Sequence, residues 1–220
     1  MHNNEIKVVI FDLDGTLIDA YQAVDDSVNH VMQILGLPRV GKKQIVRSVG
    51  WGERHLLRQF IPPDKVKRGI WLYRRHHLKS LQRHSRLLPG AKRLLNYLKK
   101  RDYLLAVASN RADRFSRMVA KNLGIFSFFD CVLCRDKVKR PKPYPDILLG
   151  ILKKFKIPPE SALYVGDMTI DIEAGHKAGV KTIVVPTGSS SRLELKRLRP
   201  FRIVNRIYDV KAVLEQMHKK

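Results

Sequence analysis

The sequence predicts an α/β protein with a doubly wound parallel sheet and an inserted α-helical domain. Short apolar runs that favour strands recur near residues 6–11, 103–108, 131–134, 162–165 and 181–185. Amphipathic helical patterns separate the later runs, and this alternation is typical of a parallel sheet covered by helices on both faces. Between the first two runs, roughly residues 20–88 show helical periodicity and no strand candidate, which indicates an insertion.

Glycine and proline mark the ends of the expected helices. Pro89-Gly90 precedes an apolar-periodic run over residues 91–100, and Gly124 follows a second such run over residues 115–123. Inside the insertion, Gly36-Leu37-Pro38 and Ile61-Pro62-Pro63 interrupt the pattern. The insertion is therefore expected to contain several helices.

These signals also predict the domain boundaries. We expect residues 1–18 and 89–220 to form the α/β core and residues 19–88 to form the helical domain. The two connections between these domains should lie near residues 18–20 and 87–90. A chain of 220 residues is long enough for a full hydrophobic core plus a small inserted module.

The chain is strongly basic. It holds 43 lysines and arginines against 20 aspartates and glutamates, a formal net charge of +23. Such a charge can speed the capture of phosphorylated substrates or hold a protein on nucleic acid. The basic residues are spread along the chain without a nucleic-acid-binding motif, although several gather between Arg192 and Arg206. Solvated surface charge is the expected role of most of them, and a nucleic-acid-associated protein stays open as an alternative.

Two further features bound the class of protein. Apolar runs are far shorter than the roughly 18 residues of a membrane span, and the N-terminus lacks a signal-peptide pattern, so we expect a cytoplasmic protein with no membrane contact. Cys131 and Cys134 are spaced as C-x-x-C but lie in an apolar strand candidate. Because a structural zinc site needs two more Cys or His ligands nearby, we expect both to be buried strand residues.

The first strand candidate ends in two carboxylates. Asp12 and Asp14 stand two positions apart in Phe11-Asp12-Leu13-Asp14-Gly15-Thr16, so an extended backbone directs both to the same side. The carboxyl end of a parallel strand is where doubly wound folds keep their ligand crevice. Paired acids there suggest Mg²⁺ and phosphate chemistry, although a solvated acidic turn explains this segment alone equally well.

Three later segments carry polar residues at equivalent places. Ser109-Asn110 and Gly166-Asp167 each follow a strand candidate, and Asp171 comes four residues after Asp167. Lys142 stands between two prolines, whose stiff backbone favours a positioned cation. Each segment alone also fits a helix cap or a surface charge, but their order along the chain argues for one shared site.

Taken together, these motifs resemble the haloacid dehalogenase (HAD) superfamily, in particular the phosphoglycolate phosphatase-like branch of its Mg²⁺-dependent phosphatases. The resemblance covers nearly the whole chain. The matching stretches are Phe11-Asp12-Leu13-Asp14-Gly15-Thr16-Leu17-Ile18-Asp19, Ala108-Ser109-Asn110, Lys142-Pro143-Tyr144-Pro145-Asp146 and Gly166-Asp167-Met168-Thr169-Ile170-Asp171-Ile172-Glu173-Ala174-Gly175. It implies a Rossmann-like core and a mobile helical cap that closes over the active site, with the two connections near residues 18–20 and 87–90 as its hinges.

The resemblance implies roles for four aspartates. Asp12 would be the nucleophile that forms an aspartyl-phosphate, and Asp14 the general acid and then the general base. Family members bind Mg²⁺ through the residues at Asp12 and Asp167 and through the backbone carbonyl at the position of Asp14. The residue at Asp171 supports a metal-bound water.

Three other residues would bind the phosphate. Ser109, Asn110 and the backbone N–H groups that follow them would hold its non-transferring oxygens, as helix N-termini commonly bind anions. Lys142 would supply positive charge to the phosphoryl group.

The cap is expected to select the substrate. Arg47 and Arg54 flank Val49-Gly50-Trp51-Gly52, which resembles the specificity loop of the family's caps, with Trp51 in place of a usually small or polar residue. We therefore expect the substrate to be a small anionic phosphomonoester similar to phosphoglycolate. Pyrophosphate, a sugar phosphate or a nucleotide stays open as an alternative.

Overall fold

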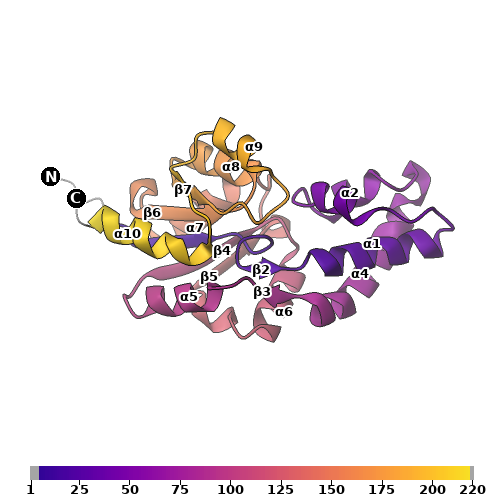
Figure 1. The fold of residues 1–220 in the computed structure, drawn as a ribbon, viewed down its shortest axis with the longest axis horizontal. Helices are drawn as coiled ribbons and strands as arrows, with labels where there is room; N and C mark the ends of the chain where they lie inside the picture. The colour runs from indigo at the N-terminus through magenta and orange to yellow at the C-terminus, as the bar shows by residue number, and fades with distance from the viewer. Residues whose placement is uncertain (1–4, 219–220) are drawn as a thin grey trace.

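The computed structural model describes residues 5–218. A parallel sheet with helices on both faces forms the larger part, and a helical bundle lies beside it (Figure 1). The parallel sheet with helices on both faces is the α/β architecture that the sequence predicts. In the described part of the chain, no helix is both long enough and apolar enough to cross a membrane.

Six parallel strands form the sheet in the order β5-β4-β1-β6-β7-β8. The strands are β1 (Val8–Phe11), β4 (Leu104–Ser109), β5 (Cys131–Cys134), β6 (Ala162–Gly166), β7 (Lys181–Val184) and β8 (Arg202–Ile203). The first five confirm the predicted strands to within two residues at each end. Strand β1 lies between β4 and β6, so the chain leaves it in one direction and later returns to its other side, which is the doubly wound topology.

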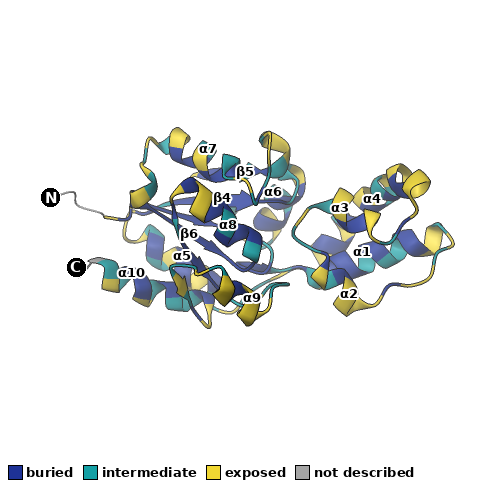
Figure 2. Ribbon diagram, turned by 90° about the horizontal axis from the view of Figure 1, so that it is seen from above, coloured by how far each residue is buried: buried dark blue, intermediate teal, exposed yellow. Residues whose placement is uncertain are grey.

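The composition of β1 explains its central place. All four of its residues are buried. Val9 and Phe11 pack into the hydrophobic cluster on one face, while Val8 and Ile10 pack into the cluster on the other. A strand that is apolar on both sides is stable only with helices on both faces, as in parallel sheets. Figure 2 shows the buried strands between helices whose outer surfaces are exposed.

Helices cover the sheet in two layers. Apolar residues of α5, α6 and α10 join the first cluster, and residues of α7 and α8 join the second. Helix α9 packs beyond α8 through Leu195 and Ile172. The helices of the core are α5 (Ala91–Lys99), α6 (Asp113–Asn122), α7 (Asp146–Phe155), α8 (Thr169–Ala178), α9 (Arg192–Arg197) and α10 (Val210–His218). Short 3₁₀ segments cover Phe126–Phe128, Arg135–Lys137, Pro159–Ser161 and Ile207–Asp209.

The insertion has its own hydrophobic core. Its helices are α1 (Tyr21–Ile34), α2 (Lys42–Arg47), α3 (Glu53–Arg58) and α4 (Val66–His84), with a 3₁₀ segment at Pro63–Lys65. Val28, Ile45, Leu57 and Tyr73, one from each helix, are among the buried residues of this core. The helices therefore pack as one unit, which we call the cap.

Two short strands join the cap to the sheet. Strand β2 (Ile18–Asp19) pairs antiparallel with β3 (Arg86–Leu87). The expectation of no strand between residues 20 and 88 is therefore wrong at β3. A strand of two residues is too short to show an alternating pattern. Strands β2 and β3 pair because the fold brings together the two segments that connect the cap to the core.

Two other regions of the core bear on the sequence analysis. The basic tail between Arg192 and Arg206 forms α9 and the edge strand β8, which no strand signal indicated. Cys131 and Cys134 begin and end β5, and both are buried and free. The prediction that they are structural strand residues is confirmed.

Candidate active site

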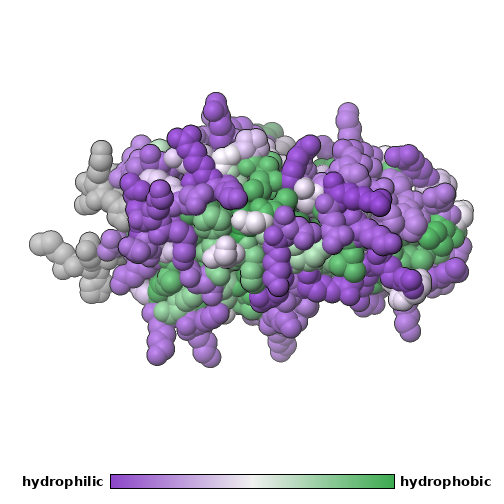
Figure 3. Space-filling model, turned by 90° about the horizontal axis from the view of Figure 1, so that it is seen from below, coloured by the Kyte–Doolittle hydropathy of each residue, from purple (hydrophilic) through white to green (hydrophobic). Residues whose placement is uncertain are grey.

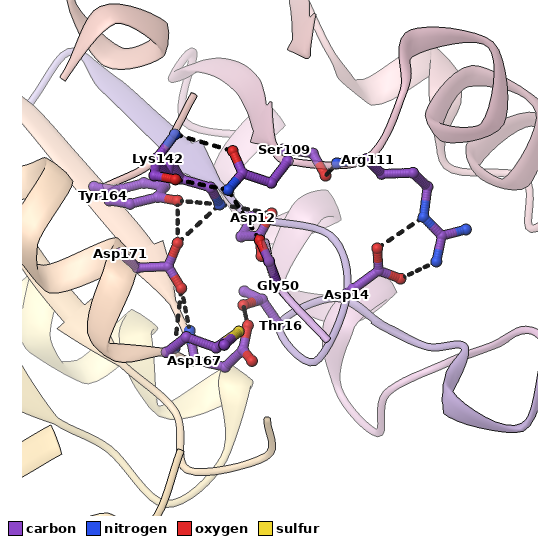
Figure 4. Close-up of polar contacts among 12 residues, drawn as sticks. Asp12, Asp14, Thr16, Gly50, Ser109, Arg111, Lys142, Tyr164, Asp167 and Asp171 are labelled. Carbon is purple, nitrogen blue, oxygen red and sulfur yellow. Dashed lines mark hydrogen bonds and ion pairs between the residues drawn. The ribbon is translucent and has the colours of Figure 1, made fainter. Parts of the chain in front are cut away.

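The predicted site residues meet at the carboxyl edge of the three central strands. Asp12 follows β1, Ser109 ends β4, and Asp167 follows β6. Because β4 and β6 flank β1 in the sheet, their ends lie side by side, and Lys142 from the β5–α7 connection reaches the same place (Figure 4). This is the topological switch point, where doubly wound sheets bind ligands.

Three buried carboxylates form the centre of the site. Asp12, Asp167 and Asp171 each offer an oxygen within 4.8 Å of the others. Burial raises the pKa of Asp12 to about 7, with the charges of Asp171 and Asp14 adding to this effect and Lys142 opposing it. Burial and the neighbouring acids raise the pKa of Asp167 well above its usual range. Such a cluster is stabilised when a positive charge lies among its members.

One buried oxygen of the cluster has neither a hydrogen-bond partner nor an ion-pair partner within the described residues. Thr16 donates a hydrogen bond of 2.6 Å to Oδ1 of Asp167, whereas Oδ2 of Asp167 is buried and accepts none. An unpaired buried carboxylate oxygen is costly unless a cation or water satisfies it. Together with Asp12 and Asp171, it gives a set of hard oxygen donors that suits Mg²⁺.

Lys142 supplies a fixed positive charge beside the acids. Its side chain is buried, and Nζ donates to Oδ1 of Asp171 at 2.8 Å and to the hydroxyl of Tyr164 at 2.9 Å. Nζ also lies 3.0 Å from Oδ1 of Asp12 as an ion pair. Burial lowers the pKa of Lys142, but the charges of Asp12 and Asp171 outweigh this, so the net shift is upward and the ammonium stays charged.

Asp171 organises this part of the site. Its Oδ2 accepts from the backbone N–H groups of Asp167 and Met168, which caps α8, and its Oδ1 accepts from Lys142 and Tyr164. The sequence left open whether Asp171 caps a helix or belongs to the active site, and its carboxylate does both. Tyr164 was missed by the sequence analysis, because a tyrosine inside an apolar strand looks like an ordinary core residue.

Ser109 and Asn110 are also buried at the site. The hydroxyl of Ser109 accepts from the backbone N–H of Arg111 at 3.1 Å. The side-chain amide of Asn110 exchanges two hydrogen bonds with the backbone of Lys142 and donates a third, of 2.9 Å, to the carbonyl of Gly50. Asn110 thus holds the Lys142 segment and the cap loop in place, a role that the sequence analysis did not foresee.

Asp14 lies apart from the three-acid cluster and pairs with an arginine. Nε of Arg111 donates to Oδ2 of Asp14 at 2.8 Å, and Nη2 donates to Oδ1 in a shorter contact (Figure 4). The side chain of Asp14 is 21% exposed and that of Arg111 only 8%. Arg111 was missed because it reads as one surface arginine among many in a basic chain.

A cavity opens beside these residues, between the cap and the core. The centres of water-sized molecules can occupy about 80 Å³ of it. Its walls include Asp12, Asp14, Ser109, Asn110 and Lys142 from the core motifs, Arg111, Phe115 and Arg135 from the rest of the core, and Gly50, Glu53, Leu56, Tyr73 and His77 from the cap.

Only one of the predicted specificity residues of the cap lines the cavity. Gly50 lines the cavity, whereas Arg47, Trp51 and Arg54 are exposed and lie outside its walls. The arginines that do line it, Arg111 and Arg135, come from the core.

The loop lies directly on the core because glycine allows a close approach. Gly50 and Gly52 have φ values of 111° and 85°, which favour glycine. A Cβ at Gly50 would meet Met168 at 2.5 Å, and one at Gly52 would meet the guanidinium of Arg135. Nη1 of Arg135 donates to the Trp51 carbonyl at 3.2 Å, so the structure shows the cap in contact with the site.

The fold and the site together define an α/β enzyme whose buried carboxylates and lysine suit a divalent cation and a phosphate group. The comparisons with known proteins agree with this class. A family model of haloacid dehalogenase-like hydrolases matches residues 9–185. The chain belongs to this family, and within it to the phosphoglycolate phosphatase-like phosphatases, as the sequence motifs indicated.

Two curated relatives and one solved structure illustrate the similarity. Phosphoglycolate phosphatase of Aquifex aeolicus is 31% identical over 183 residues, covering 83% of this chain and 86% of that protein. N-acetylmuramic acid 6-phosphate phosphatase of Pseudomonas putida is 32% identical over 187 residues, covering 83% and 84%. A crystal structure described as a "predicted phosphoglycolate phosphatase" from Haemophilus somnus 129PT has a TM-score of 0.90 at 25% identity and covers 97% of this chain and 99% of its own.

Proposed function

We propose that this phosphatase is Mg²⁺-dependent and hydrolyses a small anionic phosphomonoester similar to phosphoglycolate through an aspartyl-phosphate on Asp12. The observation that carries the proposal is the meeting of Asp12, Asp167 and Asp171 within 4.8 Å, with Lys142 bonded among them. The names of several relatives, including that of Aquifex aeolicus, support phosphoglycolate as the substrate to test first.

Asp12 and Lys142 would act on the phosphoryl group. Phosphate esters resist attack because their oxygens repel an incoming nucleophile, so the site must neutralise charge and hold the attacker in line. Lys142 is held by Asp171 and Tyr164, and its ammonium is therefore fixed beside the carboxylate of Asp12. Attack by Asp12 followed by water divides one difficult hydrolysis into two displacements and regenerates the carboxylate.

Asp12, Asp167 and the backbone carbonyl of Asp14 would hold Mg²⁺, with Asp171 next to them. When bound, Mg²⁺ would neutralise charge on the transferring phosphoryl group. The unpartnered oxygen of Asp167 supports this placement.

Asp14 would move the proton. Its carboxylate lines the cavity and stays outside the three-acid cluster, where it would protonate the leaving oxygen and then take a proton from the attacking water. Its ion pair with Arg111 fixes where that carboxylate lies in the absence of substrate.

The small cavity supports a small substrate. With the cap in contact with the core, the centres of water-sized molecules can occupy about 80 Å³ beside Asp12 and Asp14, which favours a small phosphate ester. Aromatic and apolar side chains of the cap and core, Leu56, Tyr73 and Phe115, are among the residues that line it.

The test is release of inorganic phosphate from 2-phosphoglycolate by the full chain. We expect Mg²⁺-dependent turnover that EDTA abolishes and excess Mg²⁺ restores. Asp12→Asn should lower kcat by at least about 1,000-fold, since it removes the nucleophile while preserving shape. A melting temperature close to that of the native protein is the control for folding. Turnover that persists in Asp12→Asn or in EDTA would contradict the proposal.

A further inference from the structure

The cavity contains a buried guanidinium group that the ion pair with Asp14 does not fully use. Nε and Nη2 form one edge of the planar guanidinium of Arg111, and they donate to the two oxygens of Asp14. Its Nη1 is buried and has no hydrogen-bond partner among the described residues. Because guanidinium donors are normally satisfied when buried, this nitrogen marks a position for an acceptor that comes from outside the chain.

The groups around Arg111 indicate the charge of that acceptor. Tyr73, His77 and Phe115 line the same cavity. Burial, and next to it the positive charge of Arg111, hold the pKa of His77 well below 6.5, so His77 is neutral there, and its ring nitrogens contact the hydroxyls of Ser27 and Tyr73. Asp14 is the acid that pairs with Arg111, and none of these other groups accepts from Nη1, so an anionic oxygen there would meet an unused guanidinium donor.

Arg135 adds to the positive charge at the rim. It lines the cavity and binds the cap loop through the Trp51 carbonyl. Arg47 and Arg54, the cap arginines that the sequence favoured for anion binding, are exposed and outside the cavity. The positive charge that lines this chamber therefore comes from the core, beside the carboxylates of Asp12, Asp14 and Glu53.

We propose that Arg111 binds a carboxylate on the alcohol part of the substrate, through the Nη1–Nη2 edge that faces away from Asp14. This deepens the proposed function and rests on it, because it assumes that the ester is cleaved beside Asp12. Paired donors of arginine match the two oxygens of a carboxylate. The substrates selected are phosphate esters that carry a carboxylate on the alcohol part.

The experiment compares two ligands of similar size. In ethyl phosphate a methyl group replaces the carboxylate of 2-phosphoglycolate. Arg111→Gln removes the charge and the fork, Arg111→Lys keeps only the charge, and Arg58→Gln changes an exposed cap arginine outside the cavity as a matched control. Any effect of Arg111 through Asp14 alone acts on both esters, so the ratio of the two kcat/KM values isolates recognition of the carboxylate.

We expect Arg111→Gln to lower kcat/KM for 2-phosphoglycolate about 10- to 100-fold more than for ethyl phosphate, mainly through KM, as for loss of a charge-assisted hydrogen bond. Arg111→Lys should give an intermediate ratio, and Arg58→Gln the native one. Equal losses for both esters in Arg111→Gln would overturn the proposal. Melting temperatures establish that each variant is folded.

Calorimetry separates this inference from the proposed function. 2-Phosphoglycolate and ethyl phosphate are titrated into Asp12→Asn with and without Arg111→Gln, in the presence of Mg²⁺. If the native enzyme cleaves neither ester but 2-phosphoglycolate binding still depends on Arg111, the phosphatase proposal fails and carboxylate recognition stands. If Arg111→Gln leaves the affinity for 2-phosphoglycolate unchanged, carboxylate recognition fails whatever the turnover.

Discussion

Single side chains in this site each serve two purposes. Asp171 caps α8 and holds Lys142, and Asn110 binds both the Lys142 segment and the cap loop. Because the same hydrogen bonds support folding and position the charges, a conservative change at such a residue should be felt in both stability and activity.

Tyr164 offers a test of this coupling. Tyr164→Phe removes only the hydroxyl that links Lys142 and Asp171 in the buried network. We expect the free energy of unfolding to fall by about 1–3 kcal/mol, because two charged groups lose a buried partner. We also expect kcat/KM to fall about 10-fold, because Lys142 is then less firmly oriented. Urea unfolding and steady-state kinetics measure the two effects.

Tyr144→Phe is the matched control for that change. Tyr144 is 47% exposed, so its variant should stay within about 0.5 kcal/mol of the native protein. A Tyr164→Phe variant as stable and active as Tyr144→Phe would show that the hydroxyl does not support the site.

At the scale of elements, the strands that position the site are those with uniformly apolar sequences. Strands β1, β4 and β6 are buried over nearly their whole length, and apart from Tyr164 in β6 their polar residues begin where the strands end. A run that is apolar on both faces is a local property, so the sequence predicts these strands well. The two-residue strands β2, β3 and β8 depend on neighbours brought by the fold, so their own residues carry too little signal.

The contact of the cap loop with the core can be tested by substituting Gly50. Gly50→Ala adds a Cβ that meets the side chain of Met168, at a φ of 111° that disfavours alanine. We expect the loop to withdraw from the core and kcat/KM to fall about 10-fold, because closure of the cap brings its walls to the substrate. Steady-state kinetics with 2-phosphoglycolate measure the loss.

Gly36→Ala is the control that separates the effect of the contact with Met168 from the effect of placing alanine at a positive φ. Gly36 also has a positive φ, of 67°, but a Cβ there meets nothing within 4 Å. Both variants should lose about 1 kcal/mol of stability, whereas Gly36→Ala should keep kcat/KM within about twofold of the native value. Equal kinetics in the two variants would contradict a role for close contact of the loop.

At the scale of the whole molecule, the excess of positive charge is the dominant property. Hydrophilic side chains cover much of the face seen in Figure 3, with apolar groups between them. Ion pairs such as Arg86–Asp19 and Arg140–Asp146 are largely exposed on the arginine side, and acids are too few to pair with every base. A net charge of +23 should therefore act on anions at a distance.

Salt dependence tests this effect. Raising the ionic strength from about 0.02 M to about 0.3 M shortens the screening length from roughly 20 Å to under 10 Å. We expect kcat/KM for 2-phosphoglycolate to fall about 5- to 10-fold and kcat to stay constant, because only capture is slowed. Measurements at fixed free Mg²⁺, with potassium chloride as the varied salt, check it. A salt-independent kcat/KM would mean that the charge only solvates the surface.

Local patterns in the chain were enough to predict the class of fold, the order of its main elements and the motif residues Asp12, Asp14, Ser109, Lys142, Asp167 and Asp171. Strand burial, helix ends and the spacing of two carboxylates are local properties, and local properties can be read from a linear string. Which side chains bond to or pack against one another depends on the three-dimensional arrangement of the chain. This arrangement joined Tyr164 to Lys142, paired Asp14 with Arg111 and brought Gly50 against Met168, because these contacts depend on how distant segments pack.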